Sequence, residues 1–192
     1  MPAVFYELTM NANDRPFALF VTWTCYGTWL PGDHRGHVSN VLLPTARYQR
    51  SDDMPGTPFA PGDSRTRKRA VSLQKYSTTR LSSVEAHAVA ESLLQTAITE
   101  GWSILRAAIM FNHVHVVVCK CPCDGPAVRR LLKGRAHTDL SRSSREPRRW
   151  WTQGGSDRYL NDESSVSGAV RYVANQPNPL AEIAEGRILI RE

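Results

Sequence analysis

The stretch WSILRAAIMFNHVHVVVCK, residues 102–120, decides the fold of this chain. It contains two runs of apolar and β-branched residues, Trp102–Met110 and His113–Lys120, separated by Phe111 and Asn112. Hydrophobic runs of this length, joined by so short a connection, are typical of two antiparallel strands. The sequence therefore predicts a β-hairpin here.

The second strand of this hairpin carries two histidines, His113 and His115. Successive side chains of a strand point to opposite faces, so both imidazoles share one face, about 7 Å apart along the strand. The residues that then point together toward the core are Val114, Val116 and Val118. Two imidazoles at this spacing are able to bind one divalent cation through nitrogen. A chain with six histidines produces about 0.2 such pairs by chance, so the pair by itself fits a surface or core-edge position equally well.

Before the hairpin, the sequence indicates a strand, a long irregular segment and a helix. Phe17–Cys25 is rich in aromatic and β-branched residues, which predicts a buried strand. The segment that follows is rich in Pro, Gly, Asp and Arg without a sustained period, so we expect an irregular insertion at about residues 31–80. Ser82 and Glu85 then form a capping-box pair, and the apolar pattern after them predicts a helix that ends at Gly101.

After the hairpin, we expect a helix over Ala127–Ser141 and a final helix that begins near Asp162 and ends before Pro177. Short strands are expected near Trp150–Thr152, Arg158–Leu160 and Ile188–Ile190. The order strand, helix, strand, strand, helix, strand, then one more helix is typical of a ferredoxin-like α+β sandwich with an antiparallel sheet. We expect residues 1–192 to form one such domain, with the insertion after its first strand.

The final helix carries Tyr172, with Gln176 one turn later. Their i, i+4 spacing places both side chains on one ridge of the helix. The apolar stripe of this helix consists of Val166, Ala169, Val170, Val173 and Ala174. Tyr172 falls about 120° and Gln176 about 90° from that stripe, where a cleft between helix and sheet would open. A half-buried ring at a helix edge is the commoner fate of a single tyrosine, and the spacing does not distinguish the two.

The formal net charge of +6 is concentrated in one stretch. Residues 126–151 contain eight cations and two acids, so the rest of the chain is balanced. A concentration of arginine that ends in two tryptophans predicts phosphate contacts beside a stacking surface, although a solvated face has the same composition. The residues predicted to bind nucleic acid are Arg129, Arg130, Lys133, Arg135, Arg148, Arg149 and Trp150. A second cluster, Arg65–Arg69, fits a DNA contact and an ordinary solvated loop equally well.

The composition is that of a globular protein, with 41% hydrophobic and 22% charged residues. No apolar run approaches the roughly 18 residues of a membrane helix, and the first residues lack the pattern of a secretory signal. Three of the four cysteines, at positions 119, 121 and 123, are too close together for an ordinary disulfide framework. We therefore expect no membrane partner and a cytoplasmic protein, associated with the nucleoid when it is bound to DNA.

Three motifs span most of the chain in a fixed order. They are Phe20-Val21-Thr22-Trp23 with Tyr26-Gly27-Thr28-Trp29-Leu30, then Asn112-His113-Val114-His115, and then Tyr172-Val173-Ala174-Asn175-Gln176. Together they resemble the HUH superfamily, which is named for its His-hydrophobic-His strand. The chain looks most like the small single-tyrosine insertion-sequence transposases and the REP-associated tyrosine transposases. The long insertion and the cysteine run depart from the compact pattern of these families.

The resemblance implies a metal-dependent single-strand DNA endonuclease and strand transferase, that is, a transposase. His113, His115 and Gln176 would bind Mg²⁺ or Mn²⁺. Tyr172 would attack the scissile phosphate and leave a 5′-phosphotyrosine and a free 3′-hydroxyl. The implied partner is single-stranded or hairpin DNA. A monomer and a homodimer that shares its active sites both fit the resemblance.

Two other functions stay compatible with the sequence. One is a non-catalytic nucleic-acid-binding protein that keeps the same fold and the same basic face. The other is a metal-dependent phosphodiesterase that uses water as its nucleophile and leaves Tyr172 without a catalytic role.

Overall fold

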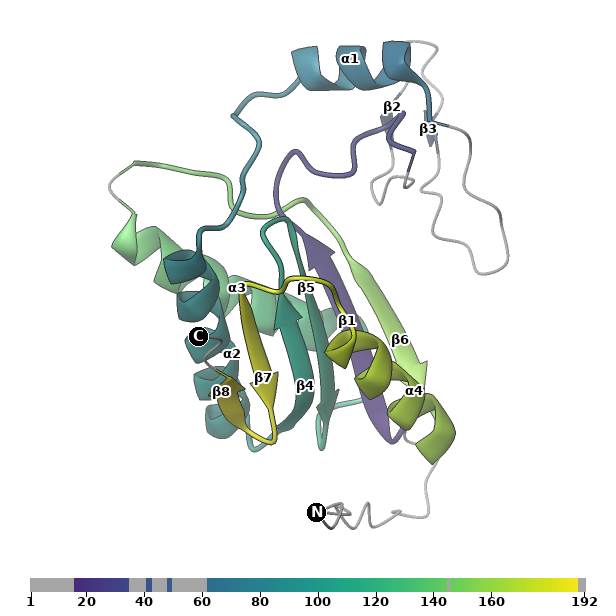
Figure 1. Cartoon of the computed structure of the whole chain (residues 1–192), viewed down its shortest axis with the longest axis vertical. Coiled ribbons are helices and arrows are strands. Elements are labelled where there is room, and N and C mark those ends of the chain that lie inside the picture. Colours follow the sequence, from purple (N-terminus) through teal and green to yellow (C-terminus); the bar gives the residue numbers. More distant parts are fainter. Residues whose placement is uncertain (1–15, 35–40, 43–47, 50–61, 145, 190–192) are drawn as a thin grey trace.

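The predicted hairpin lies in the middle of a six-stranded antiparallel sheet (Figure 1). The computed structural model of the chain describes residues 16–34, 41–42, 48–49, 62–144 and 146–189. The strands of the sheet are β1 (Ala18–Thr24), β4 (Ser103–Ile109), β5 (His113–Cys119), β6 (Ser156–Leu160), β7 (Ala181–Ala184) and β8 (Arg187–Leu189). Their order across the sheet is β6-β1-β5-β4-β7-β8.

Three helices cover the two faces of this sheet. They are α2 (Ser83–Glu100), α3 (Gly125–Ser143) and α4 (Glu163–Ala174). Figure 1 shows α4 crossing one face, with α2 and α3 on the other. The connection β1, α2, β4, β5, α3, β6 and then α4 confirms the predicted α+β, ferredoxin-like order.

Alternation along the strands divides the core into two clusters. On the α2 and α3 face, the odd-numbered residues of β1 meet the even-numbered valines of β5; the members are Leu19, Val21, Trp23, Val114, Val116 and Val118. On the α4 face, Phe20 and Val117 pack against Val166, Ala169 and Val173 of the helix. The predicted inward direction of the three valines is confirmed, since each is fully buried.

The predicted caps of α2 and α4 are confirmed, whereas α3, expected over Ala127–Ser141, extends two residues further at each end. Ser82 Oγ accepts a hydrogen bond from the backbone N–H of Glu85, and the Glu85 carboxylate accepts one from the N–H of Ser82 at 2.8 Å. Gly101 ends α2 with φ of 72°, in the left-handed region that glycine tolerates. At the start of α4, the Asp162 carboxylate accepts from the N–H of Ser165 at 2.7 Å.

The segment that was predicted to be irregular contains a helix, α1 (Ser64–Ser72), and a short pair of strands, β2 (Val41–Leu42) and β3 (Tyr48–Gln49). Along all of α1 no side chain is buried, so this helix has no apolar stripe from which periodicity would predict it. Its start is fixed locally by the Asp63 carboxylate, which accepts from the N–H groups of Arg65 and Thr66 at 3.0 Å.

Two further predictions were incomplete. The strand expected near Trp150–Thr152 is reduced to a single bridge between Cys25 and Trp151. The small terminal strand forms a hairpin, because β8 pairs with β7. β7 was not predicted, since its four residues are too few to show a hydrophobic period. None of the described helices is long and apolar enough to cross a membrane.

Candidate active site

The α4 face of the sheet carries a row of polar side chains between its apolar residues. Thr22 of β1 lies directly opposite His115 of β5, and Thr24 lies opposite His113. Because alternation places these residues on the same face as Phe20 and Val117, they point toward α4 rather than toward α2 and α3. The two histidines therefore share a face, as predicted.

Three of the predicted site residues come together beneath α4. The ring centroids of His113 and His115 are 4.6 Å apart, in an edge-on arrangement. The ring of Tyr172 stands edge-on to His115 with a centroid separation of 5.6 Å, and it lies 5.8 Å from the ring of Phe20. All these groups belong to one chain, so a single copy contains the whole cluster.

Tyr172 remains accessible because α4 packs through a different stripe. Val166, Ala169 and Val173 are buried, whereas Tyr172 is 53% exposed at the edge of the helix. Its ring contacts His115 edge-on, and about half of the residue stays exposed to solvent. A phenol in this position can meet a substrate that approaches from outside the protein.

His115 is held as a neutral ring. It is only 5% exposed, and its Nδ1 lies 2.8 Å from the hydroxyl of Thr22. Burial lowers the pKa of His115 to about 3, and the nearby imidazole of His113 contributes to the same shift. A neutral imidazole with Nδ1 engaged leaves Nε2 as the nitrogen that would bind a cation.

His113 has the same arrangement on its own side of the pair. Its Nδ1 lies 2.7 Å from the side-chain oxygen of Asn112, so this nitrogen carries the proton and Nε2 is the nitrogen with a lone pair. Metal-binding histidines usually have an oxygen partner on the second ring nitrogen, which orients the ring. The two histidines therefore suit a divalent cation, which each ring would bind through Nε2.

The third ligand is less defined. Within the described part of the chain, no Cys, Asp, Glu or further His joins the two histidines in a group able to hold a metal ion. Gln176 follows α4 directly, and its side-chain amide donates to the carbonyl oxygen of Tyr172 at 3.2 Å. The amide oxygen is not used in that bond. Gln176 as a ligand stays a prediction.

Sequence reasoning assigned no role to the residues that support the histidines. Thr22 and Asn112 belong to the motifs quoted above, but only the structure shows that they contact His115 and His113. A signal was present in β1, where Thr22 and Thr24 alternate with large apolar residues. Hydroxyls at alternate positions of a buried strand indicate a polar row on one face.

The basic stretch lies mainly on the other side of the sheet. α3, which carries four of the predicted DNA-binding residues, packs on β1, β6 and α2 in the cluster opposite α4. Trp150 is 1% exposed, and its indole N–H donates to Ser141 Oγ at 3.1 Å. The predicted stacking role of Trp150 is therefore wrong, because neither face of its ring is accessible to a base.

Two predicted cations of α3 have partners within the fold. Arg129 forms a salt bridge with Asp157 of β6, and both side chains are largely buried. Lys133 donates to the carbonyl oxygens of Thr152 and Gly154. Burial lowers the pKa of Lys133 to about 8, with repulsion from neighbouring arginines as a second cause. These bonds hold α3 to the segment before β6.

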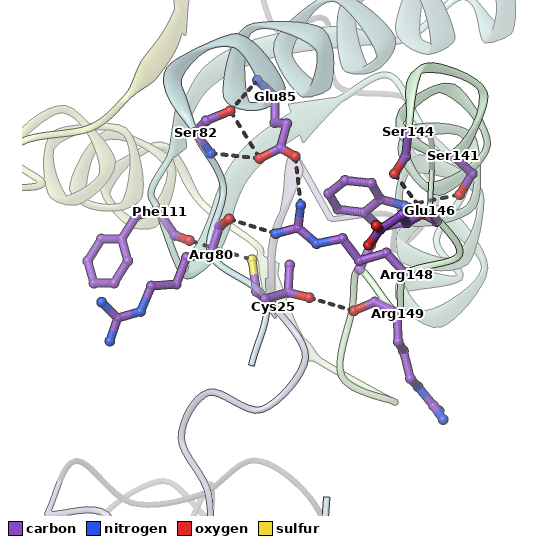
Figure 2. A network of polar contacts seen from close by, with 12 residues as sticks. Cys25, Arg80, Ser82, Glu85, Phe111, Ser141, Ser144, Glu146, Arg148 and Arg149 are labelled. Carbon is purple, nitrogen blue, oxygen red and sulfur yellow. Dashed lines mark hydrogen bonds and ion pairs between the residues drawn. The ribbon is translucent and has the colours of Figure 1, made fainter. Parts of the chain in front are cut away.

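Arg148 also has a structural role. Figure 2 shows its guanidinium between Glu85 and the backbone of Arg80. It lies 2.8 Å from the Glu85 carboxylate and donates to the Arg80 carbonyl oxygen at 3.0 Å. The remaining predicted cations, Arg130, Arg135 and Arg149, are exposed, and DNA contact by any of these residues stays a prediction.

No protein-family profile and no curated protein matches the sequence. Among solved structures, the chain is similar to a REP-associated tyrosine transposase bound to a REP hairpin, with 7% identity and a TM-score of 0.48 over 85% of this chain and 68% of the other. It is also similar to a putative transposase from Deinococcus radiodurans R1, with 13% identity and a TM-score of 0.42 over 87% and 95%. The two likenesses concern the arrangement of helices and strands, and at these values they carry no argument about activity.

Proposed function

We propose that this chain is a metal-dependent single-strand DNA endonuclease and strand transferase, that is, a transposase with Tyr172 as its nucleophile. The observation that supports this proposal most directly is the contact of the Tyr172 ring with His115, which in turn contacts His113. A half-exposed phenol beside two imidazoles suits covalent phosphoryl transfer at a cation.

The histidines, with Gln176 as the proposed third ligand, would hold Mg²⁺ or Mn²⁺. When bound there, such a cation would polarise the scissile phosphate as a Lewis acid. Thr22 and Asn112 keep Nδ1 of each ring engaged, which leaves Nε2 of each ring as the nitrogen that would bind the cation.

Tyr172 would form a bond from its phenolic oxygen to phosphorus while the bond from phosphorus to the 3′ oxygen breaks. The phenol proton is lost to solvent, and the departing 3′ oxygen takes up a proton as a hydroxyl. The result is a 5′-phosphotyrosine and a free 3′-hydroxyl, with no net change in the number of phosphoester bonds. Because the number of phosphoester bonds is unchanged, a second 3′-hydroxyl is able to attack the phosphotyrosine, release Tyr172 and join a new strand.

The proposed class of substrate depends on how a DNA phosphate would reach Tyr172 and His115. The ring of Tyr172 contacts Phe20 and His115 of the sheet, so a phosphate attacked by Tyr172 would have to come close to the edge of α4. A single strand or the unpaired end of a hairpin has an exposed backbone that meets this requirement. Exposed arginines elsewhere on the surface would hold the remaining phosphates.

The test uses a labelled DNA hairpin with single-stranded ends of random sequence, Mn²⁺ and a denaturing gel. We expect a labelled protein band that is lost in Tyr172→Phe and in His115→Asn, and that needs the metal. Tyr76→Phe is the matched control, because Tyr76 is 52% exposed, lies in the segment before α2 and has its ring against Tyr26. Cleavage that survives Tyr172→Phe would mean that water is the nucleophile, and binding without cleavage would favour a non-catalytic DNA-binding protein.

A further inference from the structure

A pocket of about 220 Å³ lies beside His113, at the loop after β1 and the β4–β5 turn. Its lining includes Trp29, Arg67, Arg80, Phe111 and Asn112, which come from the loop after β1, from α1, from the segment before α2 and from the β4–β5 turn. We propose that this pocket binds one nucleotide of single-stranded DNA, the unit that flanks the phosphate at the histidines. The choice of DNA as ligand rests on the proposed function.

The pocket and the histidine pair share a wall. Asn112 lines the pocket, and its side-chain oxygen lies against Nδ1 of His113. Trp29 also lines the pocket, and its ring centroid is 5.3 Å from that of His113. A nucleotide in the pocket is thus separated from the proposed cation site by one layer of side chains. This is the separation expected between a scissile phosphate and its neighbouring base.

The floor of the pocket is held rigidly by backbone bonds. The carbonyl oxygen of Phe111 accepts from the N–H of Leu81 at 2.8 Å, and that of Asn112 accepts from the N–H of Cys25 at 2.8 Å. The hydroxyl of Thr28 also donates to the Asn112 carbonyl, at 3.3 Å. The turn is therefore preformed, which reduces the entropy lost when a ligand binds.

Phe111 offers a surface for a base. It is 44% exposed although it occupies a tight turn beside a buried strand. The guanidinium of Arg80 lies over its ring, 5.7 Å from the centroid. Figure 2 shows the Arg80 side chain directed to the Phe111 side, while its carbonyl group is held by Arg148. The Phe111 ring is able to stack on a base while the Arg80 guanidinium contacts the phosphate of the same nucleotide.

The polarity of the pocket suits a nucleotide. Arg67 and Arg80 supply two exposed cations, against one lining acid, Asp33. The indole N–H of Trp29 is buried and has no hydrogen-bond partner among the described residues, so the wall contains a donor that a ligand oxygen would satisfy. A volume of about 220 Å³ lies below the roughly 300–1,000 Å³ of drug-sized pockets, so it has room for the base of one nucleotide, with the sugar and phosphate at its mouth.

The experiment measures binding without chemistry. The full-length Tyr172→Phe protein in EDTA is titrated, by fluorescence anisotropy, against a labelled oligothymidine of about twelve nucleotides, within the usual site size of single-strand binders. An abasic strand of the same length has the same phosphates without bases. Phe111→Leu is expected to weaken oligothymidine binding about tenfold and to leave abasic binding unchanged, since it removes the stacking surface and retains both pocket arginines.

Arg80→Ala and Arg67→Ala are expected to weaken the binding of both probes. Each should lower the slope of log affinity against log salt by about 0.7, the value for one phosphate contact on a single strand. Arg69→Ala is the control, because it removes the same charge from the same helix at a residue outside the pocket lining. Thermal unfolding of all four variants checks that they remain folded.

Two results would overturn the inference: Phe111→Leu binding oligothymidine as well as its parent, or Arg69→Ala losing as much affinity as Arg67→Ala. These results are separate from the cleavage test. A protein that cuts no DNA but loses affinity in the pocket variants keeps the nucleotide pocket and loses the proposed chemistry. A protein that cuts DNA with pocket variants of unchanged affinity keeps the chemistry and loses the pocket.

Discussion

Thr22→Val isolates the contribution of a single hydroxyl to the proposed metal site. The hydroxyl lies 2.8 Å from Nδ1 of His115, whose ring is almost fully buried. Valine has nearly the same shape and suits a strand, so packing is retained while the hydrogen bond is lost. We expect the affinity for Mn²⁺ to fall about 10- to 100-fold, the usual effect of removing the oxygen that orients a metal-binding histidine. The free energy of unfolding should fall by about 1–3 kcal/mol, because a buried ring nitrogen loses its partner.

Thr24→Val is the matched control for this change. Thr24 lies two residues further along β1, on the same face and opposite His113. It is 2% exposed, and its hydroxyl has no hydrogen-bond partner among the described residues. The same substitution there removes a buried polar atom without breaking a bond. We therefore expect unchanged Mn²⁺ affinity and a stability that is equal to the parent's or higher by about 1 kcal/mol.

The assay is isothermal titration of Mn²⁺ in the absence of DNA, together with urea unfolding of the metal-free proteins. Measuring the metal without DNA separates ring orientation from substrate binding. Equal Mn²⁺ affinities in Thr22→Val and in the parent would refute the reasoning. So would an equal loss in Thr22→Val and Thr24→Val, since that result would show a general effect of altering the strand.

Two further predictions concern groups buried around the site. Burial holds the pKa of His115 at about 3 in the folded chain, against 6.5 for an ordinary histidine, so the unfolded state binds the additional proton. In metal-free buffer the free energy of unfolding should therefore fall as the pH drops from 6.5 toward 3, by up to about 1.4 kcal/mol per pH unit, and His115→Asn should reduce that slope in urea titrations. A slope equal to the parent's would contradict the assignment. Arg106 pairs with Glu182, whose side chain is 2% exposed, so Arg106→Ala should cost about 3–5 kcal/mol by removing the salt bridge of a buried carboxylate. Thermal unfolding measures this loss, Arg106→Met with Glu182→Leu should recover most of it, and a loss below about 1 kcal/mol would exclude an important role for the pair.

The faces on which His113, His115 and Tyr172 lie could be predicted from local signals, whereas their meeting in one cluster was implied only by the family resemblance. A period of two in β5 places the histidines on one face, and the cap at Asp162 with the apolar stripe of α4 orients Tyr172. Val114, Val116 and Val118 lie on the other face of β5, so the histidine face needs a different element to cover it. These signals are local, and they do not depend on the rest of the fold.

The position of the basic stretch could not be predicted in the same way. Periodicity tells which side chains share a face, but it does not tell which helix covers that face. The burial of Trp150 depends on its place in the core cluster that β1, α2 and α3 form, and a tryptophan beside arginines looks the same in the sequence whether it stacks on bases or fills a core. α1 was not predicted because a helix without a buried side chain has no hydrophobic period.

The order of the strands has a consequence for how DNA would lie on the molecule. α3 and α4 cover opposite faces, and β6 is the edge strand that contacts both. A strand of DNA that reaches the tyrosine and the exposed cations of α3 at the same time has to turn round this edge. A short oligonucleotide would engage one face or the other, whereas a longer one engages both and gains from the raised effective concentration of its second half. The reach of the strand, in addition to its base sequence, would then decide how long the protein stays on its substrate.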